Sequence, residues 1–383
     1  MARYSREEID EAFKAYQAAG LKTARSGDWN YWGDLFTEDC TYIEHQVGQW
    51  GGREAVVREM SALMHQTEGT PWVWCNQYPV KDYVIDEDRG WVWSQIWNRM
   101  EDPGDGEVYQ TNCLTMLRYA GGGLFSYEED LYNPLAFEKM LGEWVASNEA
   151  LKKEGRETVR EARASVAHEF AELDAGDPKP PSNFYDRYAE QRRQRANVGR
   201  FPVEEIAEAF DHYCAQLALA GKTRDWRHWG AALTKDVTLI DCTLGHLGKR
   251  EAVVREVEGK LHRVDESAPW VMLSRFPSDE YVIDEASRKV WSFFWARFSD
   301  PGDGTRHEAR VFAELEYAGE GLFKQIETLY NPHHLKRALE SYVDAKKRYD
   351  ERRERRAKRL AERERKAREL APLKLDAEGR EVS

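Results

Sequence analysis

Apolar residues recur every three or four positions near the start of the chain, and the same spacing returns in its second half. The first set is Ile9, Phe13 and Tyr16, and the second is Ile206, Phe210, Tyr213 and Leu217. Spacing of this kind gathers side chains on one face of a helix. Each half of the chain is therefore predicted to open with an amphipathic helix.

Strand-like runs follow each of these helices. A short helix is expected at Trp29–Phe36 and at Trp226–Leu233, followed by a strand at Cys40–His45 and at Val237–Cys242. Further strands are expected at Trp72–Gln77, Trp91–Met100, Thr111–Tyr119 and Leu124–Tyr132, with counterparts in the second half. Pro-Gly-Asp-Gly predicts a hairpin turn, because glycine tolerates positive φ. Helices followed by a mostly antiparallel sheet predict the α+β class.

The two halves repeat each other in sequence. Glu54–Glu59, Glu-Ala-Val-Val-Arg-Glu, recurs as Glu251–Glu256, and Asp-Pro-Gly-Asp-Gly at Asp102 recurs at Asp300. Leu-Tyr-Asn-Pro, which begins at Leu131, recurs as well. A period of about 200 residues is a duplicated domain rather than a solenoid. The chain is therefore interpreted as a tandem of two modules.

Charged, helix-like sequence follows each Asn-Pro. The predicted organisation is module one at 1–145, a charged helical linker at 146–200, module two at 201–340 and a charged helical tail at 341–383. A run of interleaved acids and bases is typical of a solvated single helix. The alternative is a helix that packs on the other module or on a partner chain.

Charge and composition exclude some classes of function. The net charge is −13, which argues against binding to nucleic acid or to an anionic membrane surface. No apolar run approaches the length of a membrane helix, and no signal-peptide core opens the chain. The five cysteines show no C-x-x-C spacing, as expected of reduced thiols in a cytoplasmic protein.

One stretch carries a family resemblance. Gly27–His45, with Gly-Asp-Trp, Leu-Phe and an acid-Asp pair before a strand, is followed by Gly-Gly-Arg-Glu-Ala-Val-Val at Gly51. This pattern resembles the SnoaL-like branch of the nuclear transport factor 2-like superfamily, and module two matches it through Arg224–Trp226 and Lys249–Val253. The resemblance implies cone-shaped modules, each a curved, mostly antiparallel sheet over three helices around a deep apolar pocket.

The resemblance also implies a way of working. Enzymes of this family mostly use general acids and bases without a metal or organic cofactor. Members commonly dimerise through their sheets, so the two modules are expected to form a pseudo-dimer within one chain, and the whole protein a homodimer. The family also contains members that have no activity.

Two neighbouring residues are the first candidates for proton transfer. Glu44 falls where the resemblance places a proton-shuttling carboxylate, and module two keeps Asp241 there. His45 follows directly, and a neutral imidazole can exchange a proton near pH 7. Adjacent strand residues point to opposite faces, so both share a pocket only if the strand is bulged or ends there. The alternatives are a strand-end carboxylate facing water and a structural histidine.

Hydroxyl and amide groups form a second set of candidates. Tyr16 is matched by Tyr213 in module two and could donate a hydrogen bond, although a core-edge tyrosine is the alternative. Tyr42 lies on the strand face of Glu44. Asn98 and Asn112, which become Ala296 and Arg310 in module two, are candidates for orienting a substrate oxygen.

Three large side chains of one predicted strand can be interpreted in two ways. Trp93, Trp97 and Arg99 share a face and have counterparts in module two. They could contact a flat substrate, or they could form the interface between the sheets. If module two is the active copy, its candidates are Asp241, His246, Tyr213 and Arg310.

The sequence has no metal-ligand motif and no glycine-rich phosphate loop, so neither metal nor cofactor is expected. The predicted function is a cofactor-independent enzyme of the lyase, dehydratase or isomerase type, acting by general acid–base catalysis on an apolar, aromatic small molecule. Polyketide-, steroid- and lignin-derived compounds are the substrate types considered. The alternative is a non-catalytic protein that binds a ligand or supports assembly.

Overall fold

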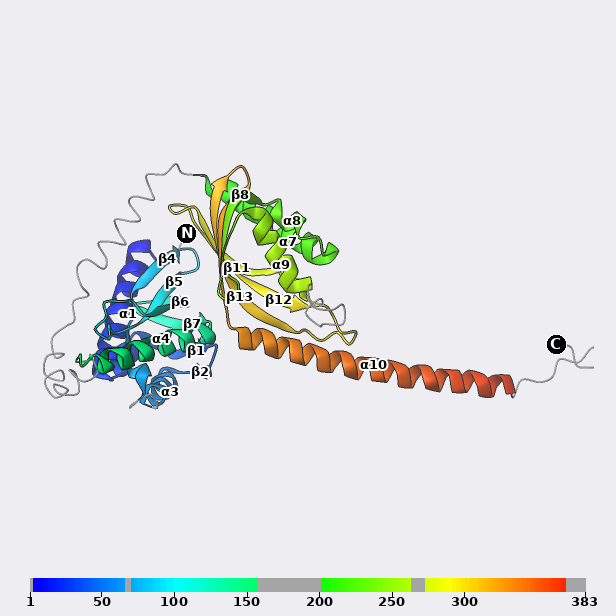
Figure 1. The fold of residues 1–383 in the computed structure, drawn as a ribbon, viewed down its shortest axis with the longest axis horizontal. Coiled ribbons are helices and arrows are strands. Elements are labelled where there is room, and N and C mark those ends of the chain that lie inside the picture. Colours follow the sequence, from blue (N-terminus) through cyan, green and yellow to red (C-terminus); the bar gives the residue numbers. More distant parts are fainter. Residues whose placement is uncertain (1–2, 66–69, 157–200, 263–272, 370–383) are drawn as a thin grey trace, which may run out of the picture.

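The computed structural model describes residues 3–65, 70–156, 201–262 and 273–369, and it contains two curled sheets that pack back to back (Figure 1). The helices lie on the outer sides, so each sheet has one face toward its own helices and one toward the other sheet. This arrangement confirms the prediction of an α+β protein with two cone-shaped modules.

Module one begins with helices and continues into a curled sheet. Ser5 caps the first helix by accepting a hydrogen bond from the Glu8 amide, and Gly27 ends it in the left-handed conformation. Its elements are α1 (Arg6–Ser26), α2 (Asn30–Gly33), β1 (Phe36–Glu44), β2 (Gly48–Gly51), α3 (Arg53–His65), the 3-10 turn η1 (Pro71–Trp74), β3 (Cys75–Gln77), β4 (Val80–Asp86), β5 (Trp91–Met100), β6 (Gln110–Gly121), β7 (Leu124–Tyr132) and α4 (Pro134–Lys153).

Module two repeats this order of elements. They are α7 (Val203–Thr223), α8 (Arg227–Gly230), β8 (Leu233–Asp241), β9 (Gly245–Gly248), α9 (Arg250–His262), β10 (Leu273–Arg275), β11 (Ser278–Asp284), β12 (Lys289–Phe298), β13 (Glu308–Gly319), β14 (Leu322–Tyr330) and α10 (Pro332–Glu369). The strand order is β2-β1-β7-β6-β5-β3 in the first sheet and the same in the second, with β4 and β11 paired to β5 and β12. Only the β1–β7 and β14–β8 pairs are parallel.

Several predicted bounds were wrong by a few residues. The first strand begins at Phe36 rather than Cys40, which leaves the short helix α2 only four residues. Gly33 in α2 lies so close to α3 that an added Cβ would sit 2.2 Å from Val57 Cγ2. The predicted strand Trp72–Gln77 is half 3-10 turn, because Pro71 favours the first turn of a helix and cannot donate to a strand ladder.

Two of the hydrophobic cores of module one lie on opposite faces of its sheet. Ile9, Phe13 and Val92 belong to the core between the helices and the concave face of the sheet. Trp93, which follows Val92 in β5, belongs to a different core together with Leu114 and Met116 of β6. This core includes Trp291, Phe293 and Phe312 of module two. Strand alternation therefore divides each sheet between its own helices and the opposite module.

The back-to-back interface also contains buried charges. Lys289 of module two lies 2.9 Å from Asp82 of module one and 2.6 Å from Glu314. Arg310 reaches both carboxylate oxygens of Glu129 across the interface, at 2.9 and 3.0 Å. Each pair joins a cation to a carboxylate, so the cost of removing these charges from water is offset by their direct attraction.

The repeated Asn-Pro motif joins each module to the other. Asn133 caps α4 by accepting from the Leu135 amide, and its own amide donates to the Cys242 carbonyl oxygen across the interface at 3.0 Å. Asn331 donates in the same way to Gln46 Oε1 at 3.1 Å. The motif therefore begins a helix and fixes the contact between the modules at once.

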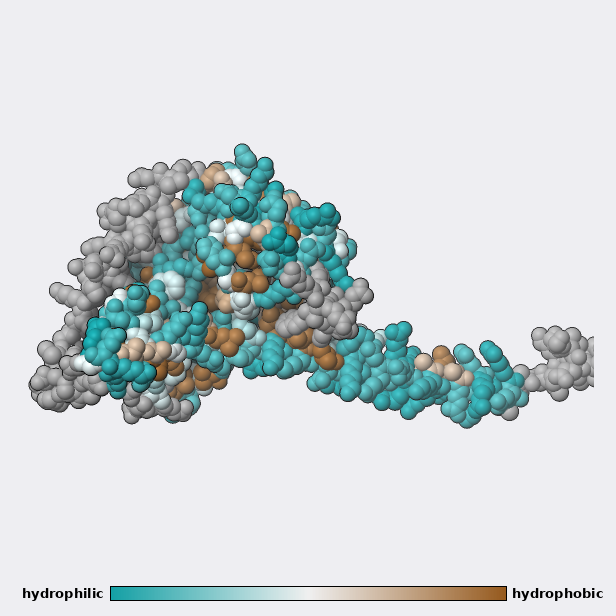
Figure 2. All heavy atoms as spheres, in the orientation of Figure 1, coloured by the Kyte–Doolittle hydropathy of each residue, from teal (hydrophilic) through white to brown (hydrophobic). Residues whose placement is uncertain are grey.

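The last helix, α10, leaves the body of the protein (Figure 1). Ala338, Tyr342 and Ala345 are buried against module two, whereas every residue from Glu351 to Glu369 is exposed. The visible surface of this outer part is mostly hydrophilic (Figure 2). The predicted single charged helix is thus present as far as Glu369. Of the predicted linker, 157–200 lie outside the described residues, as do 370–383 of the tail, and the proposed domain boundaries stay predictions.

Replacing Lys289 by methionine should destabilise the protein, because the substitution removes the cation that Asp82 and Glu314 share. Removing one partner of a buried ion pair costs about 3–5 kcal/mol. Urea unfolding followed by tryptophan fluorescence measures the change. Lys336→Met, at an exposed position in the inner part of α10, is the matched control and should change the free energy of unfolding by less than about 0.5 kcal/mol. A loss below about 1 kcal/mol for Lys289→Met would contradict the assigned role of this pair.

Candidate active site

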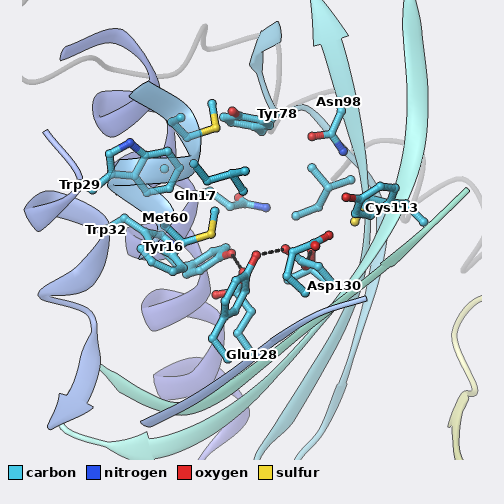
Figure 3. A pocket seen from close by; sticks show the side chains of 18 of the residues that line it. Tyr16, Gln17, Trp29, Trp32, Met60, Tyr78, Asn98, Cys113, Glu128 and Asp130 are labelled. Atoms are coloured by element: carbon cyan, nitrogen blue, oxygen red, sulfur yellow. Dashed lines mark hydrogen bonds between the residues drawn. The ribbon is translucent and has the colours of Figure 1, made fainter. Parts of the chain in front are cut away.

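A cavity of about 230 Å³ lies inside the cone of module one. Its apolar wall comes mainly from the helices and includes Trp29, Trp32 and Met60, while the strands contribute most of the polar groups (Figure 3). Figure 3 shows Glu128 and Asp130 side by side, with Tyr78 and Asn98 at the opposite end of the cavity. Gly20, Leu63, Met64, Ile96, Cys113, Tyr132 and Phe137 complete much of the remaining lining.

The register of two parallel strands brings the polar groups together. In β7, Glu128 and Asp130 are two residues apart and share the concave face. In the β1–β7 pair, Tyr42 stands opposite Glu128, and Glu44 opposite Asp130. Four functional side chains therefore meet because two neighbouring strands present the same face to the cavity.

Glu128 is a buried acid whose environment favours the protonated form. Its side chain is almost entirely buried, and Oε1 accepts a hydrogen bond of 2.7 Å from the Tyr16 hydroxyl. Burial and the nearby Asp130 raise the pKa of Glu128 well above its usual range, against the opposing effect of the Tyr16 hydrogen bond. The second oxygen, Oε2, is buried and has no hydrogen-bond partner among the described residues. A neutral carboxyl with this oxygen protonated could donate to a substrate.

Asp130 is the complementary base. Its two oxygens accept one hydrogen bond each, from Thr115 Oγ1 at 2.6 Å and from the Tyr42 hydroxyl at 2.9 Å. Burial raises the pKa of Asp130 to about 6, while these two hydrogen bonds hold it lower than burial alone would. Asp130 is thus mainly ionised above about pH 6, and its charge is one of the causes that raise the pKa of Glu128.

Glu44 is the third carboxyl group of the cavity. Its Oε2 accepts hydrogen bonds from the Gln46 and Val47 amides in the turn after β1. Burial raises the pKa of Glu44, and the proximity of the Tyr132 hydroxyl lowers it in part. Its Oε1 makes no hydrogen bond of ordinary geometry, although Tyr132 lies near enough to act on its charge.

The two phenols next to these carboxyl groups stay protonated. Burial and the charges of Glu128 and Asp130 raise the pKa of Tyr16 and of Tyr42 well above the usual value. Both hydroxyls therefore act as hydrogen-bond donors over the whole range in which the carboxyl groups change charge.

The structure brings Tyr16, Tyr42, Glu44 and Asn98 together at the cavity and places the other module-one candidates elsewhere. The ring of His45 turns to the opposite face of the sheet, where Nε2 lies 2.8 Å from Glu129 Oε1 and Nδ1 lies 3.5 Å from His334. Asn112 donates to Gln95 Oε1 at 2.7 Å and to Glu327 across the interface.

The large side chains of β5 also lie on the convex face. Trp93 is fully buried between the sheets, with its ring centroid 5.1 Å from that of Phe293. Trp97 lies under the Lys81 ammonium group, and Arg99 donates to Gln110 Oε1 at 2.8 Å. None of these three side chains is among the described residues that line the cavity.

The module-two candidates do not meet in a common cavity. Asp241 accepts from the Thr243 and Leu244 amides and from Thr328, and its pKa is lowered by Lys260 and these donors despite burial. His246 is exposed on β9, and Arg310 lies in the interface. Tyr213 is buried in a hydrophobic core.

That core replaces the polar cavity of module one. At the positions of Tyr42, Thr115 and Glu128, module two has Leu239, Ala313 and Ile326, all in one hydrophobic cluster. Asp130 becomes Thr328. The two cones therefore share a shape and differ in whether their interior can carry charge.

Sequence reasoning missed Glu128 and Asp130 as site residues. The signal was available, since both lie on one face of the last predicted strand and both change to uncharged residues in module two. The family resemblance indicated Glu44 instead.

Comparison with known proteins finds similarity to solved structures. No protein-family model and no curated protein matches the chain. Among solved structures, a hypothetical protein with a ketosteroid isomerase-like fold from Catenulispora acidiphila, in complex with trimethylamine, is 21% identical, with 32% of this chain and 85% of that chain covered and a TM-score of 0.24.

Two further similar structures are of enzymes. The epoxide hydrolase/cyclase-like enzyme SalBIII, described in pyran ring formation in salinomycin, is 13% identical, with 33% and 91% covered and a TM-score of 0.26. An LEH-like epoxide hydrolase of M. tuberculosis is 12% identical, with 37% and 94% covered and a TM-score of 0.27. At TM-scores this low the likenesses carry no argument, and the family resemblance rests on the motifs.

The described residues were also compared with the requirements of a metal site and of a membrane helix. No three His, Cys, Asp or Glu side chains among them gather in a metal-binding group. No helix in the described ranges is both long and apolar enough to cross a membrane.

The carboxyl groups of the cavity should lower stability at neutral pH. The folded pKa of Asp130, about 6, lies above that of an unfolded aspartate, so the folded state holds the proton more tightly. Stability is therefore greatest below about pH 4 for this group and falls as pH rises to about 6, by roughly 3 kcal/mol.

Asp130→Asn should accordingly raise the melting temperature at about pH 8 and lose this advantage at about pH 4. Differential scanning calorimetry across this range gives the result, with Asp241→Asn as the matched variant in module two. Because the pKa of Asp241 is lowered, that substitution should instead destabilise at about pH 8. A pH-independent effect of Asp130→Asn would contradict the raised pKa.

Proposed function

We propose that module one is a cofactor-independent acid–base enzyme of the lyase or isomerase type, which acts on a small molecule with an apolar, aromatic body. The observation that carries this proposal is that Glu128 and Asp130 line one cavity, where burial raises the pKa of both, to about 6 for Asp130 and well above the usual range for Glu128. Two carboxyl groups whose environments separate their protonation states are suited to act as acid and base in the same step.

Asp130 takes the role of base. Its carboxylate removes a proton from a substrate carbon, and the electron pair of the broken C–H bond moves into the substrate. Tyr42 and Thr115 hold both carboxylate oxygens in place, so the base is oriented before the substrate arrives.

Glu128 takes the role of acid. Its Oε2 donates a hydrogen bond or a proton to the substrate oxygen on which negative charge develops, and Tyr16 stabilises the resulting carboxylate through Oε1. In an isomerisation, Asp130 returns its proton to a different carbon and Glu128 recovers its own. In an elimination, the C–O bond breaks and the oxygen leaves with the proton of Glu128.

Remaining groups of the cavity support binding. Trp29, Trp32 and Met60 offer an apolar surface for the body of the substrate, and Asn98 at the far end can orient a second oxygen. Module two, with an apolar interior at the equivalent positions, serves as the scaffold that closes the convex face of the module-one sheet. His45 then acts on the interface rather than on the substrate.

Conservative variants of the two carboxyl groups test the proposal. Screening phenolic aromatic dimers, steroid enones and polyketide-like phenols by absorbance change supplies a substrate. Asp130→Asn and Glu128→Gln should each lower kcat by about 10²- to 10⁴-fold, because each loses proton transfer while keeping its shape. Tyr16→Phe tests the hydroxyl that donates to Glu128. Its control is Tyr213→Phe, which changes the matched residue in the module proposed as scaffold and should leave kcat unchanged.

Retention of full turnover by both carboxyl variants would remove the catalytic assignment. The cone is a binding module instead if no compound is turned over and apolar ligands quench tryptophan fluorescence in the wild type. The Met60→Trp variant, in which the new side chain fills the cavity, should then show no such quenching.

The rate should also depend on pH in a defined way. Because the pKa of Asp130 is about 6, kcat/KM should rise through this pH as the base loses its proton. It should fall again at a higher pH, where Glu128 loses its own proton. Rates measured at constant ionic strength give the profile, and residual activity of Asp130→Asn should lack the rise near pH 6.

A further inference from the structure

The cavity of module one has an imbalance of charge. Of its described lining residues, three are carboxylic acids, namely Glu44, Glu128 and Asp130, and none is lysine, arginine or histidine. His45 lies close enough for its charge to act on Asp130, but its ring faces Glu129 on the other side of the sheet.

Several other buried carboxylates among the described residues are paired with a cation. Asp82 and Glu314 share the ammonium group of Lys289, and Glu129 pairs with the guanidinium of Arg310. Burying a charge without a partner is costly, and at the interface the fold supplies a cation to each of these carboxylates. The acids that line the cavity have no such cation among the described lining residues.

Two carboxyl oxygens are directed at this space without a donor of ordinary geometry. Glu128 Oε2 is one, on a side chain that is only 2% exposed, and Glu44 Oε1 is the other, on a side chain that is 5% exposed. Glu44 Oε1 still lies near the Tyr132 hydroxyl, whereas Glu128 Oε2 has no partner among the described residues. A buried carboxyl oxygen of the second kind is suited to a hydrogen bond with a ligand, as an acceptor or, when protonated, as a donor.

The aromatic walls add a second, independent feature. The rings of Trp29 and Trp32 meet at 81° with centroids 5.6 Å apart, and those of Trp32 and Tyr42 meet at 80° with centroids 5.7 Å apart. Rings set at right angles around a space present electron-rich faces from different sides, which is the arrangement that holds ammonium groups.

Module two shows the same corner closed. Trp226 and Trp229 meet at 83°, but Trp226 is almost fully buried and packs on Phe276, at 5.9 Å between centroids. Module one has Tyr78 at the position of Phe276, and Trp29 there is only partly buried. The open aromatic corner thus occurs in the module that also has the acids.

We infer that the cavity of module one takes a cationic ligand, an amine or quaternary ammonium compound, whose positive group lies between the Trp29, Trp32 and Tyr42 rings and the carboxyl groups of Glu44 and Asp130. This inference rests on the proposed function only in using the same cavity, and it narrows the substrate class to amine-bearing molecules. A neutral Glu128 remains available as the acid, since Asp130 and Glu44 supply the negative charge.

A pair of probes with the same shape isolates the effect of charge. Choline and 3,3-dimethylbutan-1-ol differ by a quaternary nitrogen in place of a carbon. Isothermal titration of the full chain at about pH 8 should show choline binding at least about ten-fold more tightly than the alcohol. The preference should fall to about three-fold or less at about pH 5, where Asp130 is protonated.

Variants locate the binding site. Glu44→Gln and Asp130→Asn should each reduce the choline preference several-fold and leave the affinity for the alcohol unchanged, whereas Asp241→Asn in module two should change neither. A fold check by circular dichroism accompanies each variant, and the unchanged affinity for the neutral probe shows that the cavity is intact.

Two outcomes would overturn the inference. One is equal or tighter binding of the neutral alcohol, and the other is no binding of either probe. A choline preference that survives both carboxyl substitutions would also place the cation elsewhere. None of these results bears on acid–base catalysis, which is judged separately from the turnover of Asp130→Asn and Glu128→Gln.

Discussion

Strict alternation of side chains along β7 is the constraint on which the rest of the structure depends. Glu129 and Leu131 point to the opposite module, where the first meets Arg310 and the second joins the shared core. Glu128 and Asp130, between and beside them, point into the cavity. One strand therefore holds the two modules together and equips the site, and a shift of register by one residue would exchange the two sets.

The two faces of this strand solve opposite electrostatic problems. On the convex face, carboxylates are buried together with cations, so that charge is retained and neutralised by contact. On the concave face, carboxyl groups are buried beside one another, and the cost appears as raised pKa values. The cavity is thus a locally unfavourable arrangement that the surrounding packing supports, as is common at functional sites.

Much of the fold could be predicted from the sequence because its signals are local or repeated. Helical spacing at Ile9, Phe13 and Tyr16, the Asp-Pro-Gly-Asp-Gly turn and the doubled motifs led directly to two α+β modules. The sequence left open whether Glu44 and His45 share a face. Strand alternation argued that they do not, and in the structure the His45 ring does lie at the interface. The sequence places Glu128 and Asp130 on one face of a strand, but only the parallel pairing with β1 shows that Tyr42 and Glu44 stand opposite them.

The outer half of α10 has a mechanical consequence. From Glu351 to Glu369 it has no neighbour among the described residues that buries a side chain, and its regular structure is supported by pairs such as Glu351–Arg355 and Glu362–Lys366. Such pairs are individually weak and are screened by salt. The helix therefore acts as a strut of roughly 30 Å whose stiffness depends on ionic strength, whereas the two cones, held by packing and buried charge, do not share that dependence. A group attached at its outer end would be held at a nearly fixed distance in dilute buffer and would gain angular freedom as salt is added.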